Sequence, residues 1–341
     1  MKRMRALAVI MLTALIFLTA CSQEVPGAVK LVSGGGTTLS KAGAAAPREE
    51  PMDYATLRDA GSAARPQVLV NGRVYRPKAD IVNILLLGVD KDTLRREVGR
   101  SDMIMLVTLD FEAGTIQCLT IPRDTHATVY QINESGNIVG EVYEKLNHAY
   151  AYGLGPNKYS AENAMLCTAN FLNMGGEFEV PIDYYVSIDL DGIAELAGIF
   201  GGVDVTLDQD VPEVGKAGET VNLQGPTVRH YLQNRHDMSD GEVTRQLHEQ
   251  TFLKALLEEI RAAGAVQNAP ELYNMFTKFI RTNLTLSQVA DYAELLERVS
   301  NDDIEFYRLS GTGTTEDGVW YLEPDMDEAK ELVLKTQYVP A

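Results

Sequence analysis

The sequence predicts a layered α/β sandwich, and three observations favour this fold class. Three continuous apolar runs of strand length follow one another early in the chain, and strand-like segments then alternate with helix-like segments. Apolar residues make up 45% of the 341 positions, as in ordinary globular proteins. This composition excludes a wholly disordered chain and a multi-span membrane protein. We expect one folded unit over residues 67–338.

The individual elements follow from local patterns. Val68–Tyr75 carries Asn71-Gly72 between alternating residues, which predicts a hairpin with a type I′ turn. The apolar runs Ile81–Val89, Met103–Leu109 and Ile116–Ile121 predict central strands covered on both faces. Later strands are expected at 184–188, 203–207 and 304–309. Helices are expected at 162–173, 191–199, 225–233, 244–263, 272–280, 286–299 and 327–334.

The N-terminus has the pattern of an export signal. Met1–Arg5 is basic, and Ala6–Ala20 is a run of fifteen apolar or small residues, whereas a membrane-spanning helix needs about twenty. The run ends Leu18-Thr19-Ala20-Cys21, which resembles the lipobox of bacterial lipoproteins. Residues 1–20 are therefore predicted to be a lipoprotein signal peptide, with Cys21 acylated at the outer face of the cell membrane. The alternative is an uncleaved signal anchor with a chance cysteine.

The segment after Cys21 predicts a flexible tether. Residues 21–66 are rich in Gly, Ala, Pro and Ser and show no sustained hydrophobic period. The chain has 48 acidic residues against 30 Lys and Arg, a formal charge of −18, so nucleic-acid binding is not expected. Cys118 and Cys167 lie in apolar segments and are predicted to be buried thiols.

Several familiar site types are missing from the sequence. It has no phosphate-binding GxxxxGK[ST] loop, no GxGxxG after a strand and no GxSxG nucleophile elbow. His248-Glu249 is followed by Phe252, where a zinc-binding HExxH helix has its second histidine. The five histidines lack metal-ligand spacing, so structural or surface roles are expected for them.

Arginine and aspartate instead recur together at the ends of predicted strands. Strand 84–89 runs into Asp90, and Arg100-Ser101-Asp102 precedes the next strand. Strand 116–121 runs into Pro122-Arg123-Asp124, and Arg235 and Arg245 lie later, near a predicted helix start. Ligands of α/β sheets bind beyond the carboxyl ends of strands, so these clusters are predicted to converge on one crevice.

Convergent arginines suit phosphate, because the planar guanidinium offers paired donors to two oxygens. Carboxylates beside them would repel phosphate unless a hard cation lies between, which indicates Mg²⁺ bridging a carboxylate and a pyrophosphate. The alternative is that the clusters are surface salt bridges and helix caps, with Asp240 or Thr244 as the N-cap.

Taken in order, these motifs resemble the LytR-CpsA-Psr family over about residues 80–265. The motifs are ILLLGVD at 84–90, RSD at 100–102, IPRDT at 121–125, KLNHAYAYG at 145–153, IDYYV at 182–186 and GGVDV at 201–205. The resemblance implies an α-β-α sandwich around a mixed β-sheet. It also implies an extracytoplasmic phosphotransferase that moves a phosphoglycan, such as wall teichoic acid or capsular polysaccharide, from undecaprenyl pyrophosphate to peptidoglycan.

The resemblance also implies roles for individual residues. Arg100, Arg123, Arg235 and Arg245 would clamp the pyrophosphate. Asp90 and Asp102 would hold Mg²⁺, with Asp124 close by and Asp102 as the candidate proton acceptor.

The sequence departs from the family pattern near the last arginines. Where the family has Arg-x-Arg and then Arg-x-x-Arg-Gln, this chain has Gln233, His248 and Glu249 at three of those positions. Two hypotheses follow: an active Mg²⁺-dependent ligase, or a catalytically degenerate protein that binds prenyl-pyrophosphate glycans. A third, transcriptional regulation, conflicts with the export signal and the acidic composition.

Overall fold

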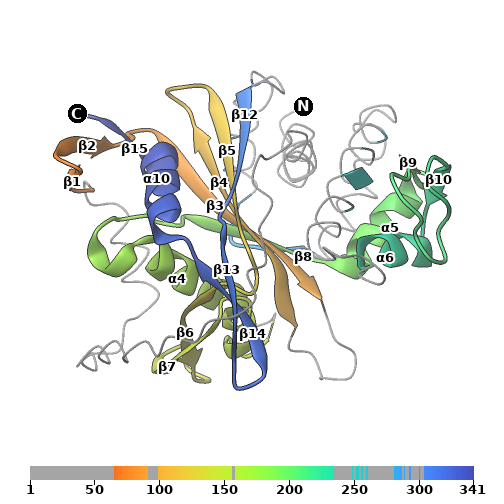
Figure 1. Cartoon of the computed structure of the whole chain (residues 1–341), viewed down its shortest axis with the longest axis horizontal. Helices are drawn as coiled ribbons and strands as arrows, with labels where there is room; N and C mark the ends of the chain where they lie inside the picture. Colours follow the sequence, from red (N-terminus) through yellow and green to blue (C-terminus); the bar gives the residue numbers. More distant parts are fainter. Residues whose placement is uncertain are drawn as a thin grey trace.

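A six-stranded mixed sheet forms the centre of the computed structural model (Figure 1). The structure describes residues 65–90, 99–155, 158–233, 280–285 and 303–341, together with 248, 251, 252, 255, 259, 288, 292 and 299. The strand order is β11-β8-β3-β4-β5-β12. β4 runs antiparallel to β3 and β5, β8 is parallel to β3, β12 is parallel to β5, and β11 is antiparallel to β8. The bounds are β3 Ile81–Asp90, β4 Arg100–Asp110, β5 Thr115–Ile121, β8 Tyr184–Asp189, β11 Ile280–Thr282 and β12 Ile304–Arg308.

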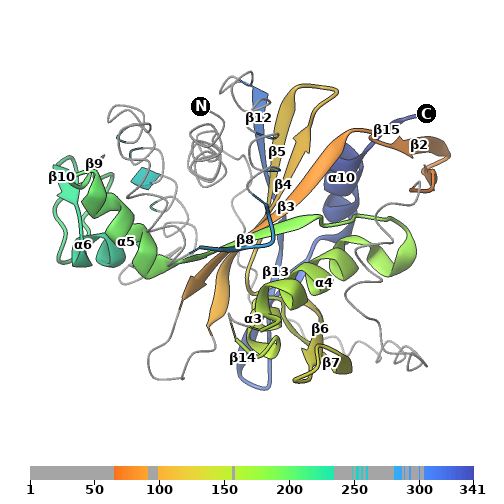
Figure 2. The same ribbon diagram turned by 180° about the vertical axis from the view of Figure 1, so that it is seen from behind.

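Both faces of this sheet are buried, which explains its continuous apolar strands. Alternate residues of β3 point to opposite faces: Ile84 and Leu86 enter one core, while Leu85 and Leu87 enter the other. The first core contains residues of α5 and α6, and the second contains residues of α3, α4 and α10 (Figure 2). The helices are α3 His148–Tyr152, α4 Ser160–Leu172, α5 Leu190–Ile199, α6 Pro226–Gln233 and α10 Met326–Gln337. The predicted α-β-α sandwich is confirmed.

Smaller sheets flank the central one. Asn71 and Gly72 have φ of 52° and 75°, so the predicted type I′ turn is confirmed at the hairpin of β1 and β2. The strands and the short 3₁₀ helix outside the central sheet are β1 Val68–Val70, β2 Arg73–Pro77, β6 His126–Ile132, β7 Ile138–Lys145, η1 Met174–Gly176, β9 Val203–Thr206, β10 Thr220–Leu223, β13 Gly311–Glu316, β14 Val319–Pro324 and β15 Tyr338–Pro340.

Some sequence predictions of elements were wrong or incomplete. The hairpins β6–β7 and β13–β14 were not predicted, because β7 and β13 contain glycine and lack the apolar continuity of the central strands. Ile280 was expected to end a helix but begins β11, where it pairs with Ile188 at the edge of the sheet. Most of the expected helices 244–263, 272–280 and 286–299 lies outside the described residues.

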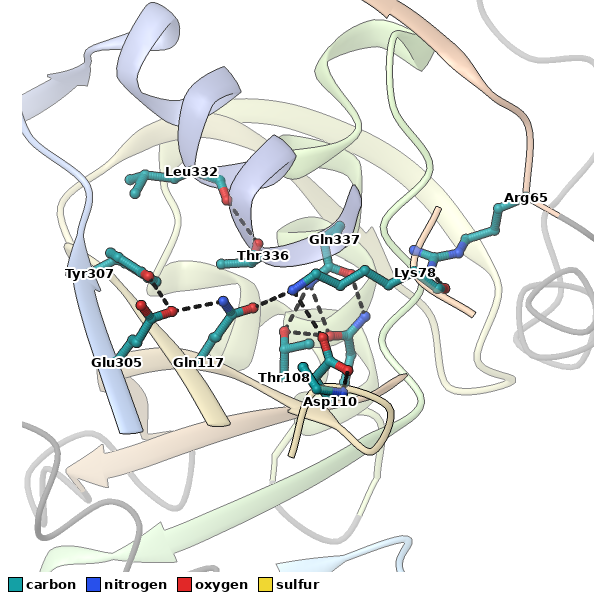
Figure 3. A network of polar contacts seen from close by, with 12 residues as sticks. Arg65, Lys78, Thr108, Asp110, Gln117, Glu305, Tyr307, Leu332, Thr336 and Gln337 are labelled. Carbon is teal, nitrogen blue, oxygen red and sulfur yellow. Dashed lines mark hydrogen bonds and ion pairs between the residues drawn. The ribbon is translucent and has the colours of Figure 1, made fainter. Parts of the chain in front are cut away.

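A buried polar network joins α10 to the sheet (Figure 3). The carboxamides of Asn83 and Gln337 bond each other reciprocally, at 2.8 and 3.1 Å, and Gln337 Nε2 also donates to Thr108 Oγ1 at 2.8 Å. Lys78 Nζ lies 3.1 Å from Asp110 Oδ2 and donates to Gln117 Oε1 at 2.8 Å. These bonds satisfy polar groups that would otherwise be costly inside the core.

The predicted thiol environments are confirmed. Cys118 and Cys167 are both buried, and both are thiols rather than half-cystines. Burial raises the pKa of the Cys167 thiol to about 12, so this side chain behaves as a small apolar group.

Among the described residues, none of the helices is long and apolar enough to cross a membrane.

Candidate functional site

The strand-end residues lie at one edge of the central sheet. β3 ends at Asp90, which pairs with Arg100 at the start of the antiparallel strand β4. β5 runs parallel to β3 and ends at Ile121, directly before the Arg123 turn. The carboxyl ends of β3 and β5 therefore meet the beginning of β4, and this brings Arg100, Asp102 and Arg123 to a common edge.

An alternating row of acids and bases, called here the Arg123 cluster, occupies this edge. Arg123 Nη1 lies 2.9 Å from Asp102 Oδ2, and Arg123 Nε lies 3.2 Å from Asp124 Oδ2. Lys145 Nζ lies 2.8 Å from the other oxygen, Asp124 Oδ1. These four side chains are 13–18% exposed, so their charges are partly shielded from water yet open to a ligand.

The backbone holds this row in place. Thr125 N and Thr125 Oγ1 both donate to Pro122 O, at 3.0 and 2.6 Å, which closes the turn that carries Arg123. Asn147 N donates to Arg123 O at 3.1 Å, and Leu146 N donates to Thr125 O at 2.8 Å. The motif at 145–153 thus supplies Lys145 and also braces the turn from the other side.

Three buried polar atoms lie in the motifs that form the site. Ser101 Oγ, Asn147 Oδ1 and His148 Nε2 have no hydrogen-bond partner within the described part of the chain. Ser101 separates Arg100 from Asp102, and Asn147 is bonded to the Arg123 turn. Buried polar groups are normally hydrogen-bonded, and these three atoms lie in the motifs that also carry Arg100, Asp102 and Lys145.

The pKa of the His148 side chain depends on the charges of the site around it. Burial lowers the pKa of its imidazole, and the positive charge of Arg100 lowers it further. Its Nδ1 lies 3.7 Å from Glu144 Oε1, a negative charge that partly opposes both effects. The lowered pKa favours the neutral imidazole beside the positive charge of Arg100.

Other predicted residues cannot be placed in this way. Asp90 is described by its backbone only, at the pairing with Arg100. Cys21, Arg235, Arg245, Glu249 and the side chain of Gln233 lie outside the described residues.

His248 is a buried histidine; of the structural and surface roles expected for the histidines, its environment is that of a structural one. Its ring is 1% exposed and stacks on Tyr231 at 4.4 Å, and its Nδ1 faces Tyr231 O at 3.2 Å. Its Nε2 lies 3.3 Å from Gln209 Nε2 and 3.5 Å from Asp208 Oδ1. An arginine at this position, as in the family pattern, would have to bury its charge between these groups.

The environment of His248 predicts a pH dependence of stability. Burial lowers its pKa, so the unfolded chain binds a proton more readily than the folded chain. The free energy of unfolding should therefore fall as the pH drops below about 6.5. Thermal melts of His248→Gln between about pH 7.5 and 5.5 should show a flatter Tm profile than wild type. His230→Gln, at a half-exposed histidine, is the matched control; equal slopes for His248→Gln and wild type would contradict the assignment.

A second set of ionisable side chains lies beside the Arg123 cluster. His126, Glu316 and Glu323 each offer one ligand atom, all within 4.8 Å of one another, so this group could hold a metal ion. Lys145 connects the two groups, since its Nζ lies 5.7 Å from the ring centroid of Tyr321, which also stacks on His126. Sequence reasoning missed Lys145 and His126 as site residues; the only signal was their place within or beside the motifs at 121–125 and 145–153.

The comparisons with known proteins agree with the fold and the motifs. A model of the LytR_cpsA_psr family matches residues 50–337. TagU of Bacillus cereus, named a polyisoprenyl-teichoic acid–peptidoglycan teichoic acid transferase, is 26% identical over 302 residues, which cover 86% of this chain and 88% of TagU.

Solved structures share the fold at lower identity. Bacillus subtilis TagV has a TM-score of 0.57 and 22% identity, over 75% of this chain and 96% of TagV. TagT with bound octaprenyl pyrophosphate lipid has a TM-score of 0.52 and 20% identity, over 76% of this chain and 90% of TagT. With the family model spanning most of the sequence, the chain belongs to the LytR-CpsA-Psr family.

Proposed function

We propose that this protein transfers a phosphoglycan of the wall teichoic acid or capsular polysaccharide type from undecaprenyl pyrophosphate to peptidoglycan. The observation that carries the proposal is the Arg123 cluster, where Arg123 is held by Asp102 and Asp124 beside unpaired buried polar atoms. TagU is named for such a transfer, and TagT has been solved with a prenyl pyrophosphate.

The chemistry requires charge to be stabilised at one phosphorus. A sugar hydroxyl of peptidoglycan attacks the phosphorus adjoining the glycan, a new P–O bond forms, and the bond to the carrier phosphate breaks. Undecaprenyl phosphate leaves, and the hydroxyl proton passes to a carboxylate, for which we propose Asp102. Negative charge grows on the equatorial oxygens and on the leaving phosphate, and we propose that Arg100 and Arg123 stabilise it.

The donors present fit Mg²⁺. Carboxylate oxygens are the ligands that Mg²⁺ prefers, and Asp102 supplies them at an edge where Asn147 Oδ1 has no partner among the described residues. Asp90 and Asp102 would hold the ion, and Asp124 would keep Arg123 in orientation. When bound, Mg²⁺ offsets the repulsion between these carboxylates and a pyrophosphate.

Arg235 and Arg245 complete the proposed clamp.

The second candidate function, binding of a prenyl-pyrophosphate glycan without transfer, is favoured by the substitutions Gln233, His248 and Glu249, and by the burial of His248 away from solvent.

One assay separates the two functions. The purified protein is incubated with a prenyl-pyrophosphate-linked glycan and peptidoglycan, with Mg²⁺ titrated, and released polyprenyl phosphate is measured. Release that depends on Mg²⁺ and is lost in Asp102→Asn supports transfer. Tight binding of the lipid without release supports the degenerate protein, and the absence of both overturns the proposal.

We further propose that the protein acts at the outer face of the cell membrane as a lipoprotein. Residues 1–20 would be the signal peptide, 21–66 the tether and 67–338 the catalytic domain, with Cys21 acylated; two or more acyl chains suffice for stable anchoring.

Cys21→Ala should abolish lipid attachment and leave the precursor uncleaved, because the cysteine thiol is the acylated group. Metabolic labelling with an alkyne fatty acid measures this directly. Cys118→Ala is the control, since that thiol is buried in β5 and should not affect the label. Full labelling of Cys21→Ala would refute the lipoprotein assignment.

A further inference from the structure

The hairpin β13–β14 packs beside the hairpin β6–β7, next to the Arg123 cluster (Figures 1 and 2). Leu322 N of β14 donates to Asp124 O at 2.9 Å, so β14 is joined through the backbone to the turn that precedes β6. Three side chains from three strands meet at this junction: His126 begins β6, Glu316 ends β13, and Glu323 lies on β14. We call this group the His126 triad.

The His126 ring is held in one orientation. It is 5% exposed and contacts two aromatic rings, with centroid distances of 3.9 Å to Tyr143 and 4.3 Å to Tyr321. Its Nδ1 faces Glu323 Oε1 at 2.5 Å. A nitrogen donor fixed in this way loses little side-chain freedom when it binds a ligand.

The two carboxylates leave the triad open to an ion. Glu316 is exposed and the side chain of Glu323 is 41% exposed, so a cation in solution reaches them directly. Both carboxylates face the same small volume, and their charges add to the effect of burial in raising the pKa of Tyr143. The triad therefore combines one oriented nitrogen with a local excess of negative charge.

We propose that the His126 triad binds a divalent transition metal of the Zn²⁺ type, separately from the Mg²⁺ proposed at Asp102. Imidazole nitrogen suits Zn²⁺, whereas Mg²⁺ is held by oxygen ligands in an octahedron. His126 Nδ1 and one oxygen from each glutamate supply three ligands, and water takes the fourth position of a tetrahedron.

The geometry needs only a small adjustment. Metal–ligand distances of about 2.0–2.2 Å in a tetrahedron separate neighbouring ligand atoms by roughly 3.3–3.6 Å. The contact between His126 Nδ1 and Glu323 Oε1 must therefore lengthen from 2.5 Å, which a rotation of the half-exposed Glu323 side chain achieves. The bound ion would fasten the β13–β14 hairpin to the start of β6, two residues after Asp124.

Metal titration of the full, untagged chain after treatment with a chelator tests the proposal. Co²⁺ serves as the probe, because tetrahedral Co²⁺ has intense visible absorption bands. One Co²⁺ per chain should bind with this spectrum, be displaced by Zn²⁺, and resist displacement by Mg²⁺. Glu316→Gln and Glu323→Gln should each weaken binding by at least about tenfold.

Glu141→Gln is the matched control, because it removes the same charge from an exposed position on β7. It should bind Co²⁺ as wild type does. His126→Asn should abolish the tetrahedral spectrum, and the two exposed or half-exposed glutamate variants decide the question if that buried substitution prevents folding. Absence of Co²⁺ and Zn²⁺ binding at millimolar concentration, or full binding by both glutamate variants, would overturn the proposal.

Discussion

Arg123→Ala is expected to weaken binding of a prenyl pyrophosphate by about ten- to a hundred-fold. A hydrogen bond to a charged group contributes about 1.5–3 kcal/mol, and each ~1.4 kcal/mol corresponds to a factor of ten in Kd. The substitution also leaves Asp102 and Asp124 without the cation between them, and their negative charges then face the ligand. Isothermal titration calorimetry with a short-chain prenyl pyrophosphate, at fixed ionic strength and with Mg²⁺, measures the change.

Two further variants test whether the loss of affinity is specific to the guanidinium of Arg123. Arg123→Lys keeps the charge but loses the fork of parallel donors, so it should recover only part of the affinity. Arg76→Ala removes the same charge from an exposed position on β2 and should bind as wild type does. If Arg123→Ala binds with unchanged affinity while its circular dichroism and Tm match wild type, Arg123 has only a structural role.

Gln337→Ala is expected to lower the free energy of unfolding by about 3–5 kcal/mol. Gln337, labelled in Figure 3, is fully buried. Its carboxamide bonds that of Asn83 in both directions. Its removal leaves a cavity under α10 and takes one hydrogen-bond partner each from Asn83 and Thr108. Urea denaturation followed by circular dichroism measures the effect.

Gln224→Ala provides the comparison for Gln337. Gln224 is an exposed glutamine that bonds Asn222 at 3.0 Å, and its loss should change stability by less than about 0.5 kcal/mol. A Gln337→Ala variant as stable as Gln224→Ala would show that the network adds nothing to the docking of α10.

Much of the central sheet was predictable because its signals are local. Continuous apolar runs identify strands covered on both faces, and β3, β4 and β5 fall where such runs occur. The Asn71-Gly72 turn follows from the low cost of positive φ at those residues. The hairpins β6–β7 and β13–β14 escaped prediction, since half-exposed strands with glycine carry neither signal strongly.

The site was predictable only in part. Arg100, Asp102, Arg123 and Asp124 were chosen because they border predicted strands, and the antiparallel order of β3, β4 and β5 places those borders at one edge. The functional roles of these residues stay predictions. Lys145 was not chosen, because it reaches Asp124 only through the pairing of β7 with β6.

The sequence by itself determined the fold class, the central strands and the family motifs of this protein, because each depends on residues close together in the chain. Only the tertiary structure decided which polar groups pair. Asn83 meets Gln337 across 254 positions, and His126 meets Glu323 across 197. Such partners depend on strand register and on the path of the chain, and hydrophobic periodicity carries information about neither.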